Sequence, residues 1–269
     1  SAPRCFEIEK RLIDELDIPV FHDDQHGTAI IVAAGLLNAL EIQEKNFKEA
    51  KIVCAGAGSA GIATLNLLLE LGFSKDNILL VDRNGVVSTK SENLSKEKLA
   101  FAVDTDKKTL SDAIEGSDVF IGVARGNLVT QEMVKSMAKR PIIFALSNPD
   151  PEISPVDVYA CRDDVLMATG RSDYPNQVNN VLGFPYIFRG ALDANSKIIN
   201  TEMKVAAVHA LKDLVKLPAP KELIEIYKDT SLTFGKDYFI PKPFDPRLIK
   251  VVPKAIFEAA VASGASRQK

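Results

Sequence analysis

Two adjacent carboxylates, Asp23 and Asp24, lie directly before an apolar segment that is predicted to be a helix. They follow the short apolar stretch 18–21, and residues 27–34 supply the first turns of the helix. Carboxylate oxygens suit hard divalent cations, so the pair could hold Mg²⁺ or Mn²⁺. On spacing alone the favoured alternative is that one Asp caps the helix and the other is solvated.

His22 and His26 flank this pair, and three cysteines are scattered elsewhere at positions 5, 54 and 161. Histidine ligands would indicate zinc, but no third His or Cys lies at a useful spacing. We therefore expect both histidines to orient neighbouring groups. No CxxC pair exists, so neither a zinc site nor a disulfide framework is indicated. Cys54 is expected to be a small buried hydrophobic residue.

A glycine-rich loop is the second feature with chemical meaning. It consists of Gly56, Ala57, Gly58, Ser59, Ala60 and Gly61, a G-x-G-x-x-G pattern. The pattern alone is weak, but here it follows a predicted strand and opens a predicted helix. The first glycine allows a tight turn, the second lets the backbone approach a pyrophosphate, and the third lets the helix pack on the sheet. The loop therefore predicts a dinucleotide site at a helix N-terminus.

Asp82 ends the next predicted strand, about 20 residues beyond the loop, where an acid is expected to accept hydrogen bonds from the ribose hydroxyls. The alternative is a strand-end Asp in a turn. Arg83 complicates the choice of cofactor, because Asp82 repels a 2′-phosphate and Arg83 attracts one. We expect a modest preference for NAD, with NADP possible.

Apolar runs and helical segments alternate through the centre of the chain. Strands are predicted at residues 52–55, 78–81, 119–123, 142–146 and 165–168, and helices at 4–17, 27–41 and 62–71. Continuous apolar strands imply a parallel sheet that is covered on both faces. The prediction is a doubly wound, Rossmann-like α/β fold with additional N- and C-terminal helices.

The C-terminal third is predicted to be helical. The clearest helix is 203–217, residues 240–244 form a rigid extended link, and a last helix follows Pro253. We expect three parts. Residues 1–26 are an N-terminal segment with part of the active-site loop, 27–200 are the dinucleotide-binding domain, and 201–269 are a helical extension packed on it.

Composition excludes several classes of partner. Of the 269 residues 46% are apolar and 26% charged, and the net charge is −3. With no basic stripe, nucleic acid and anionic membranes are not expected partners. No apolar run has membrane-spanning length, and the N-terminus does not resemble a signal peptide. Cytoplasm is the default compartment.

Over roughly its first two hundred residues the chain resembles malic enzymes, especially the short bacterial type. The motifs that carry the resemblance are residues 1–7, 21–28, 56–61, 144–149 and 179–185. The resemblance implies oxidation of L-malate with NAD or NADP, decarboxylation to pyruvate and CO₂, and a requirement for Mg²⁺ or Mn²⁺. The full protein is expected to be a homo-oligomer, a dimer.

The resemblance also implies roles for particular residues. Asp24 matches a metal ligand and Asp23 its catalytic neighbour, and Asn180 matches a residue that binds the substrate carboxylate. Asn148 matches an asparagine beside the nicotinamide and the substrate, and Val123 and Ala124 lie where the cofactor passes. From the residues alone, Asn179 and Asn180 could equally be a helix N-cap.

In the family a Glu-Asp pair of metal ligands precedes the matched segment, and a domain with a catalytic Tyr and Lys lies further upstream. None of these is in this sequence, so we expect the isolated chain to be inactive without that N-terminal catalytic domain. Two alternatives remain open. One is a non-catalytic dinucleotide-binding module, and the other is another two-domain dehydrogenase, such as one acting on amino acids.

Overall fold

The computed structural model describes residues 2–267 and confirms the predicted α/β fold. Ser1, which begins one of the motifs, lies outside the described residues. Six strands form one sheet in the order β3-β2-β1-β4-β5-β6, and only the β2–β3 pair is antiparallel. The strands are β1 (Ile52–Ala55), β2 (Ile78–Asp82), β3 (Gly85–Val86), β4 (Val119–Gly122), β5 (Ile142–Ala145) and β6 (Leu166–Thr169).

The register aligns the carboxyl ends of the parallel strands. Ala55 of β1 pairs with Val81 and Gly122, and Ala145 of β5 pairs with Gly122 and Thr169. Strands β1, β4, β5 and β6 are buried at every position, as expected for strands covered on both faces. The loops that leave these strands consequently begin at one edge of the sheet, which we call the carboxyl edge.

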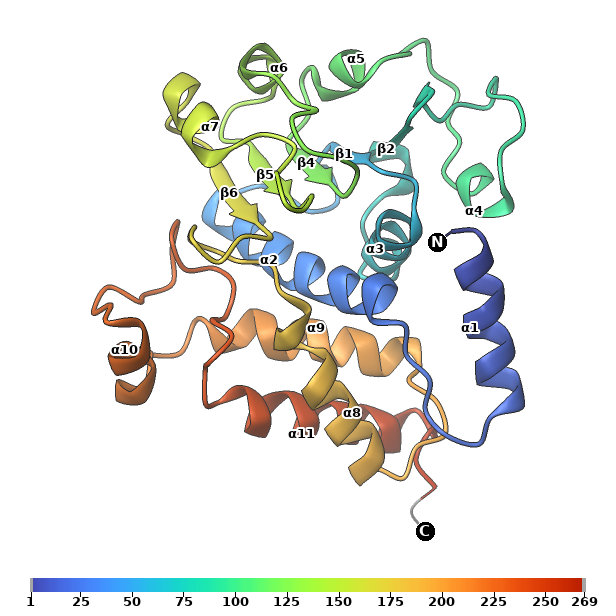
Figure 1. The fold of residues 1–269 in the computed structure, drawn as a ribbon, viewed down its shortest axis with the longest axis vertical. Helices are drawn as coiled ribbons and strands as arrows, with labels where there is room; N and C mark the ends of the chain where they lie inside the picture. Colours follow the sequence, from blue (N-terminus) through green and yellow to red (C-terminus); the bar gives the residue numbers. More distant parts are fainter. Residues whose placement is uncertain (1, 268–269) are drawn as a thin grey trace.

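Helices and helical turns connect the strands and extend the chain at both ends (Figure 1). They are α1 (Arg4–Glu15), the π-helical turn η1 (Asp23–Gly27), α2 (Thr28–Ile42), α3 (Ser59–Glu70), η2 (Lys75–Asn77), α4 (Lys96–Leu99), α5 (Leu110–Ile114), α6 (Gln131–Ser136), α7 (Pro155–Cys161), η3 (Asn180–Leu182), α8 (Phe184–Asp193), α9 (Thr201–Leu214), α10 (Lys221–Tyr227) and α11 (Leu248–Ala262).

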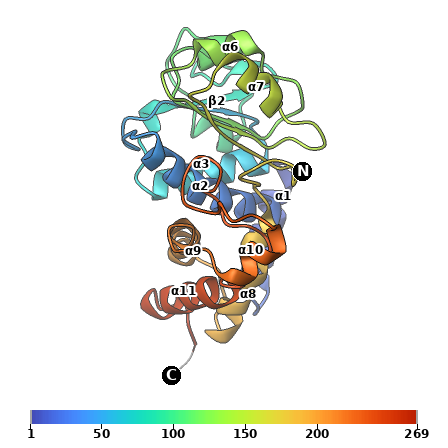
Figure 2. The same ribbon diagram turned by 90° about the vertical axis from the view of Figure 1, so that its left-hand side faces the viewer.

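The molecule is layered along its longest axis (Figure 2). Helices α6 and α7 lie over one face of the sheet, and α2 and α3 lie against the other. Helix α9 packs on α2 and α3, and α11 packs on α8 and α9. Helix α2 is buried along most of its length, as its apolar sequence predicts. Because α8 precedes residue 201 and packs on α11, the division of the chain at that residue stays a proposal.

The last helix corrects one prediction. It begins at Leu248 and runs through Pro253, so it does not start after that proline. Proline cannot donate the bond to the carbonyl of Ile249, but Ile249 is 60% exposed, so water can reach that turn. Leu248 and Val252 are fully buried, and their packing stabilises the turn ahead of the proline.

Helix α1 lies at the side of the molecule, close to α3 in Figure 1. Its buried residues are Cys5 and Glu9, whereas Ile8 and Leu12 are exposed. Within residues 2–267 no helix is both long and apolar enough to cross a membrane.

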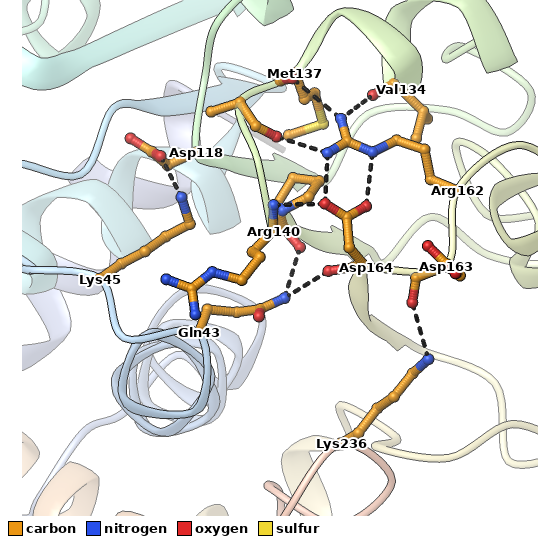
Figure 3. Close-up of polar contacts among 12 residues, drawn as sticks. Gln43, Lys45, Asp118, Val134, Met137, Arg140, Arg162, Asp163, Asp164 and Lys236 are labelled. Atoms are coloured by element: carbon orange, nitrogen blue, oxygen red, sulfur yellow. Dashed lines mark hydrogen bonds and ion pairs between the residues drawn. The ribbon is translucent and has the colours of Figure 1, made fainter.

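The opposite edge of the sheet, where the strands begin, carries a polar network (Figure 3). Arg162 makes two hydrogen bonds of 2.8 Å to the carboxylate of Asp164, just before β6, and Asp164 also accepts from the backbone N–H of Arg140. The Arg162 guanidinium further donates to the carbonyls of Val134, Met137 and Ala138. The Arg162 hydrogen bonds hold the pKa of Asp164 down at about 2.

The segment that follows α2 also contacts this edge. Lys45 donates to Asp118 at 2.6 Å, and the same carboxylate accepts from the backbone N–H of Lys51, directly before β1. Gln43 donates to the carbonyls of Pro141 and Asp164. Most of these contacts lie just before β1, β4, β5 or β6 (Figure 3). We call the contacts of Arg162, Asp164, Lys45, Asp118 and Gln43 the amino-edge network.

Candidate active site

The glycine loop leaves β1 and leads directly into α3, which begins at Ser59. Gly56 has a φ of +121°, and a Cβ there would lie 2.6 Å from the carbonyl oxygen of Val123. A Cβ on Gly61 would lie 1.9 Å from the carbonyl oxygen of Gly56. A Cβ on Gly58 would meet no atom within 4 Å. Two of the glycines are therefore needed for packing, and the third faces open space.

A cavity of about 1150 Å³ opens beside this loop at the carboxyl edge. It brings together residues that follow three different strands. Of the predicted cofactor residues it is lined by Gly56, Ala57, Gly58, Asp82, Arg83 and Ala124. The other predicted cofactor residues, Ser59, Ala60, Gly61, Val123 and Asn148, do not line it.

The charge of the lining favours an anionic ligand. Four basic residues, Arg83, Lys98, Lys108 and Arg125, line the cavity, against two acidic residues, Asp82 and Glu97. The N-terminus of α3 adds the unpaired N–H groups and the positive end of a helix dipole. A pyrophosphate group is an anion that both the basic side chains and the helix N-terminus would attract.

Asp82, at the end of β2, has two polar partners among the described residues. Lys98 of α4 forms an ion pair with it at 2.5 Å, and the backbone N–H of Asn84 donates to it at 2.8 Å. The Asp82 side chain is only 9% exposed. Sequence reasoning missed Lys98, because it lies in a four-residue helix 16 residues further on, where no motif marks it.

Asp23 and Asp24 lie in η1, and the two carboxylates differ. Asp24 is exposed and accepts no hydrogen bond within residues 2–267. Asp23 is half-buried, and its Oδ1 is a buried atom without a partner. Burial raises the pKa of Asp23, helped by the charge of Asp24 and opposed by a hydrogen bond from Asn180. A Cβ on Gly27 would lie 2.0 Å from Asp23 Oδ1, so only glycine leaves room for this carboxylate.

Asn180 reaches η1 from a segment 157 residues away in the sequence. Its Nδ2 donates to Asp23 Oδ2 at 3.1 Å and to the Asp23 carbonyl at 3.2 Å, and its Oδ1 accepts from the Thr28 hydroxyl. The capping role belongs to its neighbour, since Asn179 accepts from the backbone N–H of Val181. The structure thus assigns the cap to Asn179, and the binding role of Asn180 stays a prediction.

Asn148 and Val123 follow neighbouring strands at the same edge. Asn148 is exposed, and it lies so close to Gly170 that a Cβ there would be 3.2 Å from its Nδ2. A residue that sequence reasoning missed, Glu152, ties the two loops together. Its fully buried carboxylate accepts from the backbone N–H groups of Ala124 and Ser147. Burial raises the Glu152 pKa, and these hydrogen bonds oppose the rise.

His26 lies between two charged side chains. Its Nε2 is 2.8 Å from Glu9 Oε1, and its Nδ1 is 3.2 Å from Lys204 Nζ. Glu9 also accepts from the backbone N–H of His22. Burial disfavours the charged form of Glu9, but the hydrogen bonds and the positive neighbours keep its pKa below the ordinary value. Burial lowers the pKa of Lys204, and Glu9 opposes this.

The carboxylates suit a hard cation by type. Asp24 is exposed and unpaired, and neighbouring Asp23 has an unpartnered oxygen. Among residues 2–267, however, no group of three His, Cys, Asp or Glu side chains could hold a metal ion. The described residues therefore offer only part of a coordination shell.

Comparison with known proteins identifies the family. Residues 25–229 match the family described as the malic enzyme NAD-binding domain. The NADP-dependent malic enzyme of Halomonas elongata is 55% identical over this whole chain, which covers 64% of that protein. The NAD-dependent malic enzyme of Geobacillus stearothermophilus is 47% identical, again over the whole chain, which covers 53% of that protein.

Solved structures agree. The malic enzyme of Pyrococcus horikoshii superposes with a TM-score of 0.88 at 36% identity, and the chain covers 61% of it. That of Entamoeba histolytica gives a TM-score of 0.89 at 32% identity with 54% covered. The chain spans about a third to two thirds of the length of its curated relatives. On these grounds the chain belongs to the family of malic enzyme NAD-binding domains.

Proposed function

We propose that this chain is the cofactor-binding part of an enzyme that oxidises L-malate with NAD or NADP and decarboxylates it to pyruvate and CO₂. One observation carries the proposal. The turn η1, with its two carboxylates, packs on α3, the helix that begins in the glycine loop. The helix that would bind phosphate at its N-terminus thus packs against the turn whose carboxylates would bind a divalent cation.

The cofactor binds in the cavity at the carboxyl edge. Backbone N–H groups from Gly58 to Ala60 hold the pyrophosphate, since a side chain at Gly58 would project into open space. Asp82 contacts the adenosine ribose. Ala124 and Asn148 flank the nicotinamide half of the cofactor, and Glu152 fixes the loops that carry them.

The preference between cofactors depends on the Asp82–Lys98 ion pair. Asp82 alone would repel a 2′-phosphate and select NAD. The ammonium group of Lys98 offsets that repulsion, and Arg83 adds a second positive charge in the cavity lining. We therefore propose that both cofactors bind and that Lys98 supports binding of NADP.

The substrate binds next to η1. Asn180, which donates to Asp23, contacts the substrate carboxylate. Asp24 contributes one ligand to Mg²⁺ or Mn²⁺. Asp23, half-buried beside it and with an oxygen that has no hydrogen-bond partner among the described residues, is its catalytic neighbour. When bound, the cation supplies a Lewis acid that polarises the oxygen on the substrate's C2. Further ligands and the catalytic Tyr and Lys come from an N-terminal catalytic domain, and the full protein is a homodimer.

Calorimetric titration of the chain with NAD and NADP tests the cofactor site. We expect binding of both cofactors, and Gly58→Val should abolish it, because the new side chain enters the pyrophosphate position. Gly235→Val is the matched control, since a Cβ there meets only an ordinary contact at 3.8 Å. A folded wild-type chain that binds neither cofactor at millimolar concentration would overturn the site as described.

A further inference from the structure

The turn that carries Asp23 and Asp24 leaves several buried polar atoms without a hydrogen-bond partner among the described residues. In the part of the chain that the structure describes, five buried side-chain atoms have no hydrogen-bond partner. Three of them lie in this turn or next to it, namely His22 Nδ1, Asp23 Oδ1 and Gln25 Nε2. Buried polar atoms are normally paired, so this turn holds its shape at a cost. Contacts from outside the turn must therefore keep Asp24 in place.

Asn180 supplies one such contact, and His26 supplies the other. His26 lies two residues after Asp24. It is held by Glu9 of α1, 17 residues before it, and by Lys204 of α9, 178 residues after it. Since an ammonium group only donates and a carboxylate only accepts, His26 accepts at Nδ1 and donates from Nε2. The imidazole thus connects a cation to an anion, and both of its nitrogen atoms are used.

Packing alone does not fix this ring. Phe21 contacts it with ring centroids 5.5 Å apart and in turn packs edge-on against Phe188. Beside His26 and Lys204, however, lies a cavity of about 320 Å³ that Gln25 also lines. With space on that side, the ring is free to turn unless its two hydrogen bonds hold it.

We propose that Glu9 and Lys204 are positioning residues that act through His26 to hold Asp24 where a divalent cation binds. The hydrogen bonds that join Lys204, His26 and Glu9 anchor the C-terminal end of η1 to α9 and α1. The second hydrogen bond of Glu9, from the His22 backbone, anchors the near end of the same turn. Both ends of the five-residue turn are consequently fixed to one carboxylate. The proposal rests on the proposed metal role of Asp24.

The test compares Lys204→Met with wild type in the full-length protein. Removing the ammonium frees the ring, and we expect the Mn²⁺ dissociation constant, measured by electron paramagnetic resonance, to rise about tenfold. The dissociation constant for NADP should stay within about twofold, because Lys204 does not line the cofactor cavity. Lys204→Arg keeps a donor and should restore most of the affinity. Lys212→Met is the control, because Lys212 lies in the same helix and its ammonium group pairs with the neighbouring Asp213.

Hydrogen exchange gives a readout that needs neither metal nor activity. In Lys204→Met and in Glu9→Gln, the amides of His22, Gln25 and His26 should exchange faster, while those of the β1 strand should not change. Lys204→Ala, which also removes the donor, replaces Lys204→Met should that variant fail to fold. Unchanged Mn²⁺ affinity and unchanged exchange in a folded variant would overturn the proposal. A wild-type protein that binds no Mn²⁺ would overturn the proposed function as well, which separates the two failures.

Discussion

The two edges of the sheet differ in how their polar side chains are paired. In the amino-edge network, Arg162 and Asp164 satisfy each other and several backbone groups. At the carboxyl edge, the neighbouring carboxylates of Asp23 and Asp24 retain an unpartnered oxygen and an unpaired exposed group. The difference indicates that the Arg162–Asp164 contacts serve stability. We propose that the unpaired oxygens of Asp23 and Asp24 serve a ligand, whereas Asp82 at the carboxyl edge is held in an ion pair with Lys98.

The amino-edge network should give the largest effect on stability. Arg162→Met removes the hydrogen bonds that Arg162 donates to Asp164 and to three carbonyls, so we expect a loss of about 2 kcal/mol in the free energy of unfolding. Urea unfolding measures it. Arg140→Met is the control on the same edge, because its exposed pair with Glu44 contributes at most about 0.5 kcal/mol. Equal losses in the two variants would contradict a stabilising role for the Arg162 contacts.

At the carboxyl edge we expect an effect on binding in place of one on stability. Lys98→Ala exposes NADP to the uncompensated charge of Asp82, so NADP should bind about tenfold more weakly relative to NAD, about 1.4 kcal/mol. Calorimetry with both cofactors measures the ratio. Lys96→Ala, in the same short helix but without an ion pair to Asp82, should leave it unchanged. An unchanged ratio in Lys98→Ala would show that Lys98 does not reach the 2′ position.

The smallest effect concerns pH. Because the folded-state pKa of Asp164 is about 2, below the ordinary value of 3.8, its pairing stabilises the fold fully above about pH 4. That contribution disappears as the pH falls through about 2. The stability difference between wild type and Asp164→Asn should therefore be constant from pH 5 to 7 and shrink below pH 4. A difference that stays the same down to pH 2.5 would exclude this linkage.

Features that are encoded in local sequence patterns could be predicted, and features that depend on tertiary packing could not. The buried strands and the glycine loop were predictable, because each is a local pattern of apolar residues or glycines. The edge strand β3, of only two residues, carries no such pattern. The helix through Pro253 was predicted wrongly, since buried packing at Leu248 outweighed a local breaker.

Hydrogen-bond partners that are distant in the sequence could not be predicted from it. The motif residues of the site could be named from the sequence, and the structure brings two of them, Asp23 and Asn180, together as hydrogen-bonded neighbours. Glu9, Lys204 and Lys98 belong to no motif, and only the fold places them at the site. Their roles, like those of the motif residues, stay proposals until they are tested.

The central claim is that the free carboxylate of Asp24 is a metal ligand, and Asp24→Ala in the full-length protein tests it most directly. Malate-dependent reduction of the cofactor is measured across a series of Mn²⁺ concentrations, with Asp14→Ala, an exposed acid of α1, as the control. We predict weaker Mn²⁺ binding and a kcat lowered at least about 100-fold, about 2.7 kcal/mol, with cofactor affinity nearly unchanged. A variant that matches wild type at every Mn²⁺ concentration would show that Asp24 does not bind the metal.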